Sequence, residues 1–231
     1  MCLFFIFILL TVTSQTFICT GHFSSPRGAD VKITYLSHAC FELNDSKTIL
    51  IDPFFEGNTY APSYNGTPDL ILVTHEHFDH CDAQKFDTPV VCPPPCADLY
   101  ACASPMQIGE KTEIKGIPIH MVSASHDASS YPTGYIIELE GKRIYHMGDT
   151  YLDGVRNQGK VDILLVPIGG HYTMNSEEAL EALRIINPAL SIPMHYNTFP
   201  QIMADPLQFK DRAEEEGFTV KVLDFGETTT I

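Results

Sequence analysis

The sequence predicts a mixed α/β fold in which strands dominate the first two thirds of the chain and helices alternate with the later strands. Short apolar or alternating runs bounded by turn residues support the strands, and longer amphipathic runs support the helices. This order implies sheets with helices packed outside them. A chain of 231 residues, 44% hydrophobic and 19% charged, suits one globular domain with a sizeable core.

The elements follow one another without a repeat, a low-complexity tract or a long linker. The expected strands are 31–36, 40–43, 48–52, 70–73, 89–92, 117–123, 134–139, 143–147, 161–166, 189–193 and 219–223. Helices are expected at about 176–186 and 206–216, the first capped by Asn175 or Ser176 with glutamates following. No length remains for a recognition domain, so loops such as 54–68, 92–112 and 127–133 are expected to set substrate selectivity.

A histidine-rich cluster directly follows one of the predicted buried strands. Residues 74–81 read T-H-E-H-F-D-H-C, so His75, His77, Asp79 and His80 form an H-x-H-x-D-H pattern. Imidazoles and carboxylates bind zinc and related divalent ions, whereas the alternative is a solvated polar turn. In extended chain His75 and His77 point the same way and can share one ion. Asp79 and His80, beyond a turn, can address a second ion about 3.5–4 Å away.

Three later strands each end in a further candidate ligand. His126 follows the strand at 117–123, Asp149 follows 143–147, and His195 follows 189–193. Any one of these residues alone has an ordinary surface or core role as its alternative. Because strand ends can gather at one edge of a sheet, the three together predict additional ligands for the same site.

The succession of H-x-H-x-D-H, a lone histidine, G-D-T and a final histidine resembles the metallo-β-lactamase superfamily of metal-dependent hydrolases. The motifs Y-L-S-H at 35–38, I-D-P-F at 51–54, Y-H-M-G-D-T at 145–150, P-I-G-G at 167–170 and P-M-H-Y-N-T-F-P at 193–200 resemble its small single-domain branch. That branch is related to the L-ascorbate phosphate lactonases and, more distantly, to N-acyl-phosphatidylethanolamine phospholipase D. The resemblance covers roughly residues 31–226. It implies a four-layer αββα sandwich with metals at one edge between the sheets.

The resemblance also implies a site for two divalent metal ions, with zinc expected and manganese or iron as alternatives. It assigns His75, His77 and His126 to one ion, Asp79, His80 and His195 to the other, and Asp149 to both. A dinuclear metal-bound hydroxide would cleave an ester, lactone or phosphodiester bond in a small molecule or lipid headgroup. We predict Asp79 and His38 as catalytic residues, with Asp79 orienting the hydroxide.

Several other residues near the motifs have two interpretations. Asp52 is expected either to support a metal-bound imidazole, a role also open to His38, or to terminate a strand together with Pro53. Glu76 and Phe78 stand where the branch usually has glycine, and they are expected to narrow or alter the mouth of the site. His171 is a weaker pocket candidate. The histidines expected to be structural are His22, His120 and His146, and Cys81 is expected to serve packing.

Charge separates the candidate functions. Fourteen Lys and Arg against 29 Asp and Glu give a net charge of −15, which would repel a polyphosphate backbone, and no Lys/Arg cluster offsets it. A nucleic-acid phosphodiesterase is therefore the second hypothesis, behind the small-molecule hydrolase. A non-catalytic metal-binding protein of the same fold is the third, although all seven ligand positions are filled. A redox di-iron relative would be expected to carry Glu at the position of His77.

The N-terminus is interpreted separately from the hydrolase domain, which is expected to span 30–231. Residues 1–20 predict a signal peptide or hydrophobic segment, because Leu3–Leu10 is apolar and Val12-Thr13-Ser14 suits cleavage. Export is the expectation, while an uncleaved anchor, or a misassigned start and a cytoplasmic protein, are alternatives. Cleavage after Ser14 would leave six cysteines, and cleavage after Thr20 would leave five. Cys92, Cys96 and Cys102 are expected to form a disulfide or to be plain loop thiols.

Overall fold

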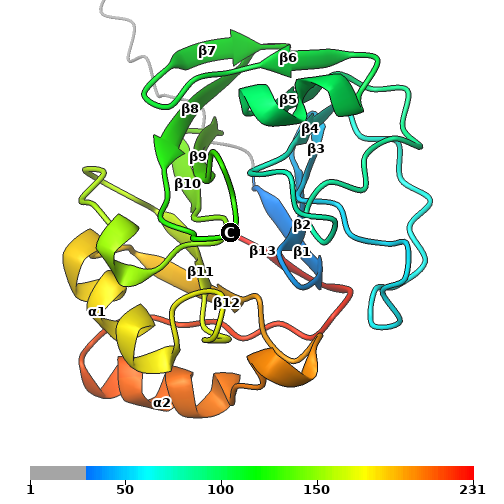
Figure 1. Ribbon diagram of the computed structural model, residues 1–231. Coiled ribbons are helices and arrows are strands. Elements are labelled where there is room, and N and C mark those ends of the chain that lie inside the picture. Colours follow the sequence, from blue (N-terminus) through cyan, green and yellow to red (C-terminus); the bar gives the residue numbers. More distant parts are fainter. Residues whose placement is uncertain (1–29) are drawn as a thin grey trace, which may run out of the picture.

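Two β-sheets face each other in the computed structural model, which describes residues 30–231 (Figure 1). The predicted signal segment and His22 lie outside the described residues. The first sheet has the order β13-β1-β2-β3-β4-β5-β6. Its strands are β1 (Lys32–Ser37), β2 (Cys40–Asn44), β3 (Thr48–Ile51), β4 (Leu70–Leu72), β5 (Val90–Cys92), β6 (Ala103–Pro105) and β13 (Glu227–Thr230).

The second sheet has the order β12-β11-β10-β9-β8-β7 and carries the helices. Its strands are β7 (Lys111–Ile114), β8 (Ile117–Ser123), β9 (Thr133–Leu139), β10 (Lys142–His146), β11 (Ile163–Pro167) and β12 (Leu190–Met194). Helices α1 (Ser176–Ile186) and α2 (Pro206–Glu215) lie together beside the β11–β12 end of this sheet (Figure 1). Short 3₁₀ helices are η1 (Pro94–Leu99), η2 (Leu152–Gly154) and η3 (Pro200–Ile202).

Strand direction explains why the candidate ligands meet. In the first sheet β1 is antiparallel to β2 and β2 to β3, while β3 and β4 are parallel, so β1, β3 and β4 run in one direction. In the second sheet β8 and β10 flank the antiparallel β9, and β10–β12 are parallel. Each sheet therefore presents the carboxyl ends of several strands at one edge, where α/β folds commonly place their sites.

The main core fills the space between the two sheets and continues to the buried faces of α1 and α2, and a smaller one lies outside the first sheet. Apolar side chains such as Phe41, Ile137 and Leu165 are fully buried in the main cluster. The smaller cluster places Ile71 and Cys92 against Cys96 of η1 and other residues. Loops and η1 thus cover this side of the first sheet, and both α-helices of the described residues belong to the second. The mixed α/β sandwich is confirmed. It differs from the expected αββα order in that loops and η1, and not α-helices, form the layer outside the first sheet.

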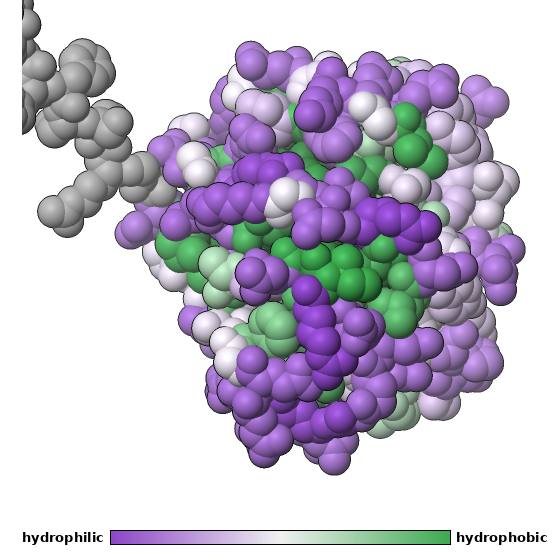
Figure 2. Space-filling view, turned by 90° about the vertical axis from the view of Figure 1, so that its left-hand side faces the viewer, coloured by the Kyte–Doolittle hydropathy of each residue, from purple (hydrophilic) through white to green (hydrophobic). Residues whose placement is uncertain are grey.

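The outer face of the second sheet is largely polar where no helix covers it. Lys111, His120, Glu138 and Arg143 line a shallow hollow on strands β7–β10. Figure 2 shows a predominantly hydrophilic face with hydrophobic residues gathered in a band across it. None of the described helices has the length and apolar character needed to cross a membrane.

The strand predictions were wrong at polar edges and at one apolar run. Strands β6, β7 and β13 were not predicted, because they are short or polar edge strands such as E-T-T-T. The predicted strand 219–223 is reduced to a bridge between Val220 and Ser191. Ser191 N donates to Thr219 O and Lys221 N donates to Ser191 O. The next donor in this parallel ladder would be residue 193, which is proline and has no N–H.

The five described cysteines are free thiols, namely Cys40, Cys81, Cys92, Cys96 and Cys102. All except Cys102 are buried. Cys92, Cys96 and Cys102 are thus plain thiols, the second of the two alternatives that the sequence left open. Cys81 packs in the smaller core.

Candidate metal centre

All seven predicted ligands lie together at the edge where strands of both sheets end. The first sheet supplies the turn that follows β4, and the second supplies the loops that follow β8, β10 and β12. The residues gathered there are His75, His77, Asp79, His80, His126, Asp149 and His195. Segments up to 120 positions apart in the chain thus form one site, since residue 75 and residue 195 both contribute.

Three imidazoles form the first group. His75 Nε2 lies 3.0 Å from His77 Nδ1, and His126 Nε2 lies 3.2 Å from the same His77 atom. Nitrogens about 2.0–2.1 Å from a tetrahedral ion would be about 3.3 Å apart. The spacing of the three atoms therefore fits a common cation.

The proton positions of His77 and His126 also fit a cation between the two rings. His77 Nε2 donates to Ala128 O at 3.0 Å, and His126 Nδ1 donates to Tyr172 O at 3.0 Å. Carbonyl oxygens only accept, so in the neutral rings His77 Nδ1 and His126 Nε2 carry lone pairs. These lone pairs face each other and repel unless a cation lies between them.

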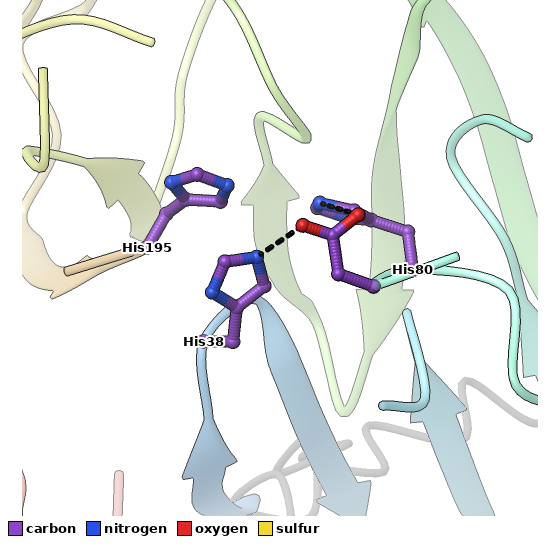
Figure 3. A group of neighbouring side chains, drawn as sticks. His38, His80 and His195 are labelled. Atoms are coloured by element: carbon purple, nitrogen blue, oxygen red, sulfur yellow. Dashed lines mark hydrogen bonds and ion pairs between the residues drawn. The ribbon is translucent and has the colours of Figure 1, made fainter. Parts of the chain in front are cut away.

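The second group contains Asp79, His80 and His195, with His38 beside them. His80 Nε2 lies 4.0 Å from Asp79 Oδ1. Figure 3 shows the rings of His38, His80 and His195 turned toward a common centre from three separate parts of the chain.

Asp149 lies between the two groups. Its Oδ1 is 3.4 Å from His80 Nε2, and its Oδ2 is 3.1 Å from His195 Nε2. Oδ2 also lies 4.0 Å from His75 Nε2 and 3.9 Å from His126 Nε2. The two carboxylate oxygens therefore reach ligand atoms of both groups.

Several buried polar atoms at this point make no hydrogen bond of acceptable geometry, although His195 Nε2 lies 3.1 Å from Asp149 Oδ2. They are His80 Nε2, Asp149 Oδ1 and both ring nitrogens of His195. Buried polar atoms are nearly always paired, and an orphaned cluster calls for an explanation such as an ion. These residues therefore fit a bound metal on the chemistry of the donor set and on its unpaired atoms.

Asp52 holds the His80 imidazole directly and the His75 imidazole through Thr74. Its carboxylate accepts from Thr74 N at 2.8 Å, Thr74 Oγ1 at 2.7 Å and His80 Nδ1 at 2.9 Å. Thr74 Oγ1 also lies 3.0 Å from His75 Nδ1. One proton of His80 is thus held at Nδ1, and Nε2 is the atom that faces Asp149.

His38 contacts Asp79. His38 Nε2 lies 3.2 Å from Asp79 Oδ2, and its Nδ1 lies 2.5 Å from Thr198 Oγ1. Since the carboxylate only accepts, Nε2–H donates to Asp79 and Nδ1 accepts a hydrogen bond from the Thr198 hydroxyl. Burial, together with the nearby His195, lowers the pKa of His38 to about 4, so the ring stays neutral.

The site attracts positive charge. Burial opposes a charge on His80, but Asp149, Asp52 and Asp79 raise its pKa well above the ordinary value. Burial and the neighbouring His80 hold the pKa of His75 well below its usual range. The carboxylates therefore stabilise a positive charge at this point, while the His75 imidazole stays neutral and can bind a metal ion.

Comparison with known proteins agrees with this geometry. The family model of the β-lactamase superfamily domain matches residues 32–195. The chain belongs to the metallo-β-lactamase superfamily. A UPF0173 metal-dependent hydrolase from Thermoplasma volcanium is 41% identical over 215 residues, covering 84% of this chain and 96% of that protein. A namesake from Pyrococcus furiosus is 39% identical over 222 residues, covering 82% and 95%.

A solved structure shows the same fold. The metallo hydrolase from the hyperthermophilic archaeon Ignicoccus hospitalis superimposes with a TM-score of 0.79 at 32% identity, covering 87% of this chain and 98% of that one. The fold that the sequence motifs implied is therefore confirmed, and the chain is a metal-dependent hydrolase of this superfamily. The two narrower relationships, to lactonases of L-ascorbate phosphate and to the phospholipase D, stay predictions.

The pocket of this hydrolase opens above the seven residues. A cavity of about 310 Å³ is lined by His77, Phe78, Asp79, His126, Ala128, Asp149, Tyr172, His195, Phe199 and Gln201. Of the three loops expected to set selectivity, only 127–133 contributes to this lining. The segment 92–112 is occupied largely by η1 and β6. The segments around Tyr172 and Phe199 line the pocket, where loops 54–68 and 92–112 were expected to do so.

Other candidate residues take varied positions. His171 is exposed with its ring against Tyr172, and it belongs to neither group. His146 is buried, where its Nε2 donates to Ala39 O, and His120 lies on the outer face of β8. Both of these arrangements agree with a structural role. Sequence reasoning missed Thr74 and Thr198, of which only Thr74, adjacent to the cluster, carried a usable signal.

Proposed function

We propose that this metal-dependent hydrolase holds two divalent ions, zinc in the first instance, to cleave an ester, lactone or phosphodiester bond. The substrate would be a small molecule or a lipid headgroup. One observation supports this most strongly: two groups of bare ligand atoms meet at the carboxylate of Asp149. His75, His77 and His126 would hold one ion, and Asp79, His80 and His195 the other.

The chain's own residues have definable tasks in such a reaction. A pair of divalent ions held by these residues would lower the pKa of a bound water and neutralise charge that develops on the substrate oxygen. Asp79 lines the pocket and offers a carboxylate to orient and accept a proton from the attacking group. His38 Nε2 donates to that carboxylate and so fixes its direction, while Thr198 fixes His38. Asp52 keeps His80 in the tautomer that ligates.

Size and charge favour a small substrate over a nucleic acid. The cavity of about 310 Å³ is at the lower end of the range of small-molecule pockets. None of the described Lys or Arg residues lines it. A nucleic-acid phosphodiesterase would need phosphate-neutralising side chains along a groove, and the net charge of −15 works against it.

Metal analysis combined with an Asp149→Asn variant tests the proposal. We expect about two ions per parent chain and hydrolysis within a panel of lactone, thioester, β-lactam and bis-p-nitrophenyl phosphate substrates. The variant keeps the side-chain volume but loses the charge, so metal content should fall and kcat/KM should drop at least about 100-fold.

The matched control is His120→Ala, which removes an imidazole outside both groups and should leave metal content and turnover unchanged. Full metal content and turnover in Asp149→Asn would contradict the role given to Asp149. A metal-loaded parent that hydrolyses none of the panel would favour the non-catalytic alternative.

We also propose, from the sequence alone, that residues 30–231 form the hydrolase domain and that residues 1–20 direct export. The apolar run Leu3–Leu10 supports this. N-terminal sequencing of the protein from its native host should find a mature chain that begins near Gln15. An intact Met1 would instead support an uncleaved segment.

A further inference from the structure

Aromatic side chains form one wall of the pocket mouth. Phe54, Phe78 and Phe199 have ring centroids 5.8, 6.0 and 6.3 Å apart in their three pairs. Phe78 and Phe199 line the pocket directly, and Tyr172 lies on its rim. Phe54 is only 3% exposed, so it forms a rigid base behind the other two rings.

Phe78 is exposed in a way that packing does not explain. The residue is 69% exposed, although its ring contacts the rings of Phe54 and Phe199. Leaving a phenyl group in water forfeits the favourable free energy of its burial. A ligand in the cavity would contact both Phe78 and Phe199, because both rings line it.

The pocket offers no cationic side chain to a charged substrate group. Its charged or ionisable lining residues are Asp79, Asp149, Tyr172 and the imidazoles of His77, His126 and His195. Lys85 lies in a separate hollow of about 540 Å³, where Glu56 and Asp82 are its acidic neighbours and its ammonium sits 4.0 Å above the Phe55 ring. A phosphate away from the reacting bond would thus find no bidentate or ammonium anchor in the pocket.

We propose that the site selects uncharged substrates whose apolar group, an aryl or short alkyl substituent, packs against Phe78 and Phe199, and that it discriminates against substrates with a separate phosphate. Phe78 is then a specificity-determining residue. This inference rests on the proposed two-metal function, since the reacting bond must lie at the metal centre. It narrows the substrate class to neutral esters, lactones or related compounds with an apolar arm.

Three thiols that share one metal-binding group test the inference without relying on turnover. They are 2-mercaptoethanol, benzyl mercaptan and mercaptomethylphosphonate, each with the form HS–CH₂–R. Calorimetry on zinc-loaded protein would measure the dissociation constant of each. We expect benzyl mercaptan to bind about tenfold more tightly than 2-mercaptoethanol, because contact between its ring and the phenylalanines adds about this much affinity. The phosphonate should bind no more tightly than 2-mercaptoethanol.

Variants at position 78 complete the experiment. Phe78→Ala should remove most of the benzyl preference, and Phe78→Lys should shift the preference toward the phosphonate. Leu207→Ala is the matched control, because Leu207 is 61% exposed and does not line the pocket. Both positions are exposed, so we expect all three variants to fold.

The outcomes separate the two proposals. If the protein takes up none of zinc, manganese and iron, or if 2-mercaptoethanol does not bind to the metal-loaded protein, the two-metal function fails. If 2-mercaptoethanol binds but the parent prefers the phosphonate or shows no benzyl preference, only the present inference is overturned. Retention of the full preference in Phe78→Ala would overturn the role of that residue.

Discussion

At the scale of single residues, Asp52 has a larger role than a strand terminator. It is buried, has a left-handed backbone with φ 45°, and binds both Thr74 and His80. Asn tolerates that backbone and matches the shape of Asp, but it cannot accept from all three donors. We expect Asp52→Asn to weaken metal binding about 10–100-fold and to lower the free energy of unfolding by about 1–2 kcal/mol.

Competitive zinc titration and urea unfolding would measure the two effects. Asp98→Asn, on the exposed surface of η1, is the control and should change neither quantity. Parent-like zinc affinity in Asp52→Asn would show that Asp52 only terminates β3, which was the other interpretation of the sequence.

At the same scale, the sequence reveals the chemical groups of the site better than it reveals their hydrogen-bond partners. The gathering of the seven candidate ligands was predictable because clustered imidazoles and carboxylates are rare, chemically specific and placed at strand ends. The role of Asp52 in holding the proton of His80 was one of the two interpretations of its position, but the partners of His77 and His126 were not predictable, because they are backbone carbonyls. Ala128 O lies 51 positions from His77, and Tyr172 O lies 46 positions from His126. A carbonyl leaves no signature in a sequence, so these contacts appear only with the fold.

At the scale of elements, Glu76 ties the ligand turn after β4 to the loop after β8. Its carboxylate accepts from Ser129 Oγ at 2.8 Å, Ser130 N at 2.8 Å and Ser130 Oγ at 3.0 Å. Burial opposes its ionisation, but these bonds, that of Ser130 N foremost, lower the pKa of Glu76. The same loop carries Ala128 O, which holds His77, so Glu76 indirectly positions a ligand.

We expect Glu76→Ala to release this loop. The amide of Ser130 should exchange hydrogen faster, and the zinc affinity of the first group should fall about tenfold, with a stability loss of about 1–2 kcal/mol. Hydrogen exchange and zinc titration measure these changes. Glu76→Gln retains one acceptor and should recover part of the loss, whereas Glu113→Ala, exposed on β7, should have no effect. Unchanged hydrogen exchange at the Ser130 amide would show that Glu76 does not hold this loop in place.

Elements were predictable where local signals were strong. Helix α1 spans 176–186 as expected, and Asn175 with Glu178 forms its capping box. Strand β7, K-T-E-I, and β13, E-T-T-T, form from pairing with β8 and β1 and not from their own composition. Conversely, the apolar run at 219–223 lacks a ladder because Pro193 on β12 offers no donor. Pairing between distant segments decided these cases, and composition carries no record of it.

At the scale of the whole molecule, the site lies where the two sheets meet. His75, His77, Asp79 and His80 belong to the turn after β4 of the first sheet, whereas His126, Asp149 and His195 follow strands of the second. His195 N also donates to His38 O at 2.7 Å, which joins the ends of β12 and β1. Each metal group therefore contains side chains from both sheets. An ion bound there would link the sheets and bind the folded chain far better than the unfolded one.

Metal removal should consequently destabilise the fold as a whole. An ion at 100 times its dissociation constant adds about 2.7 kcal/mol, and 1 kcal/mol shifts the Tm of a chain of this size by about 2–4 °C. Calorimetry with a chelator should therefore show a Tm lower by at least about 5 °C, and stoichiometric zinc should restore it. Asp149→Asn, which lacks the shared carboxylate, should respond less to the chelator, because less metal is bound at the start. If chelator and zinc leave the parent Tm unchanged, the ions do not link the sheets, and the buried imidazoles must be stabilised by the protein alone.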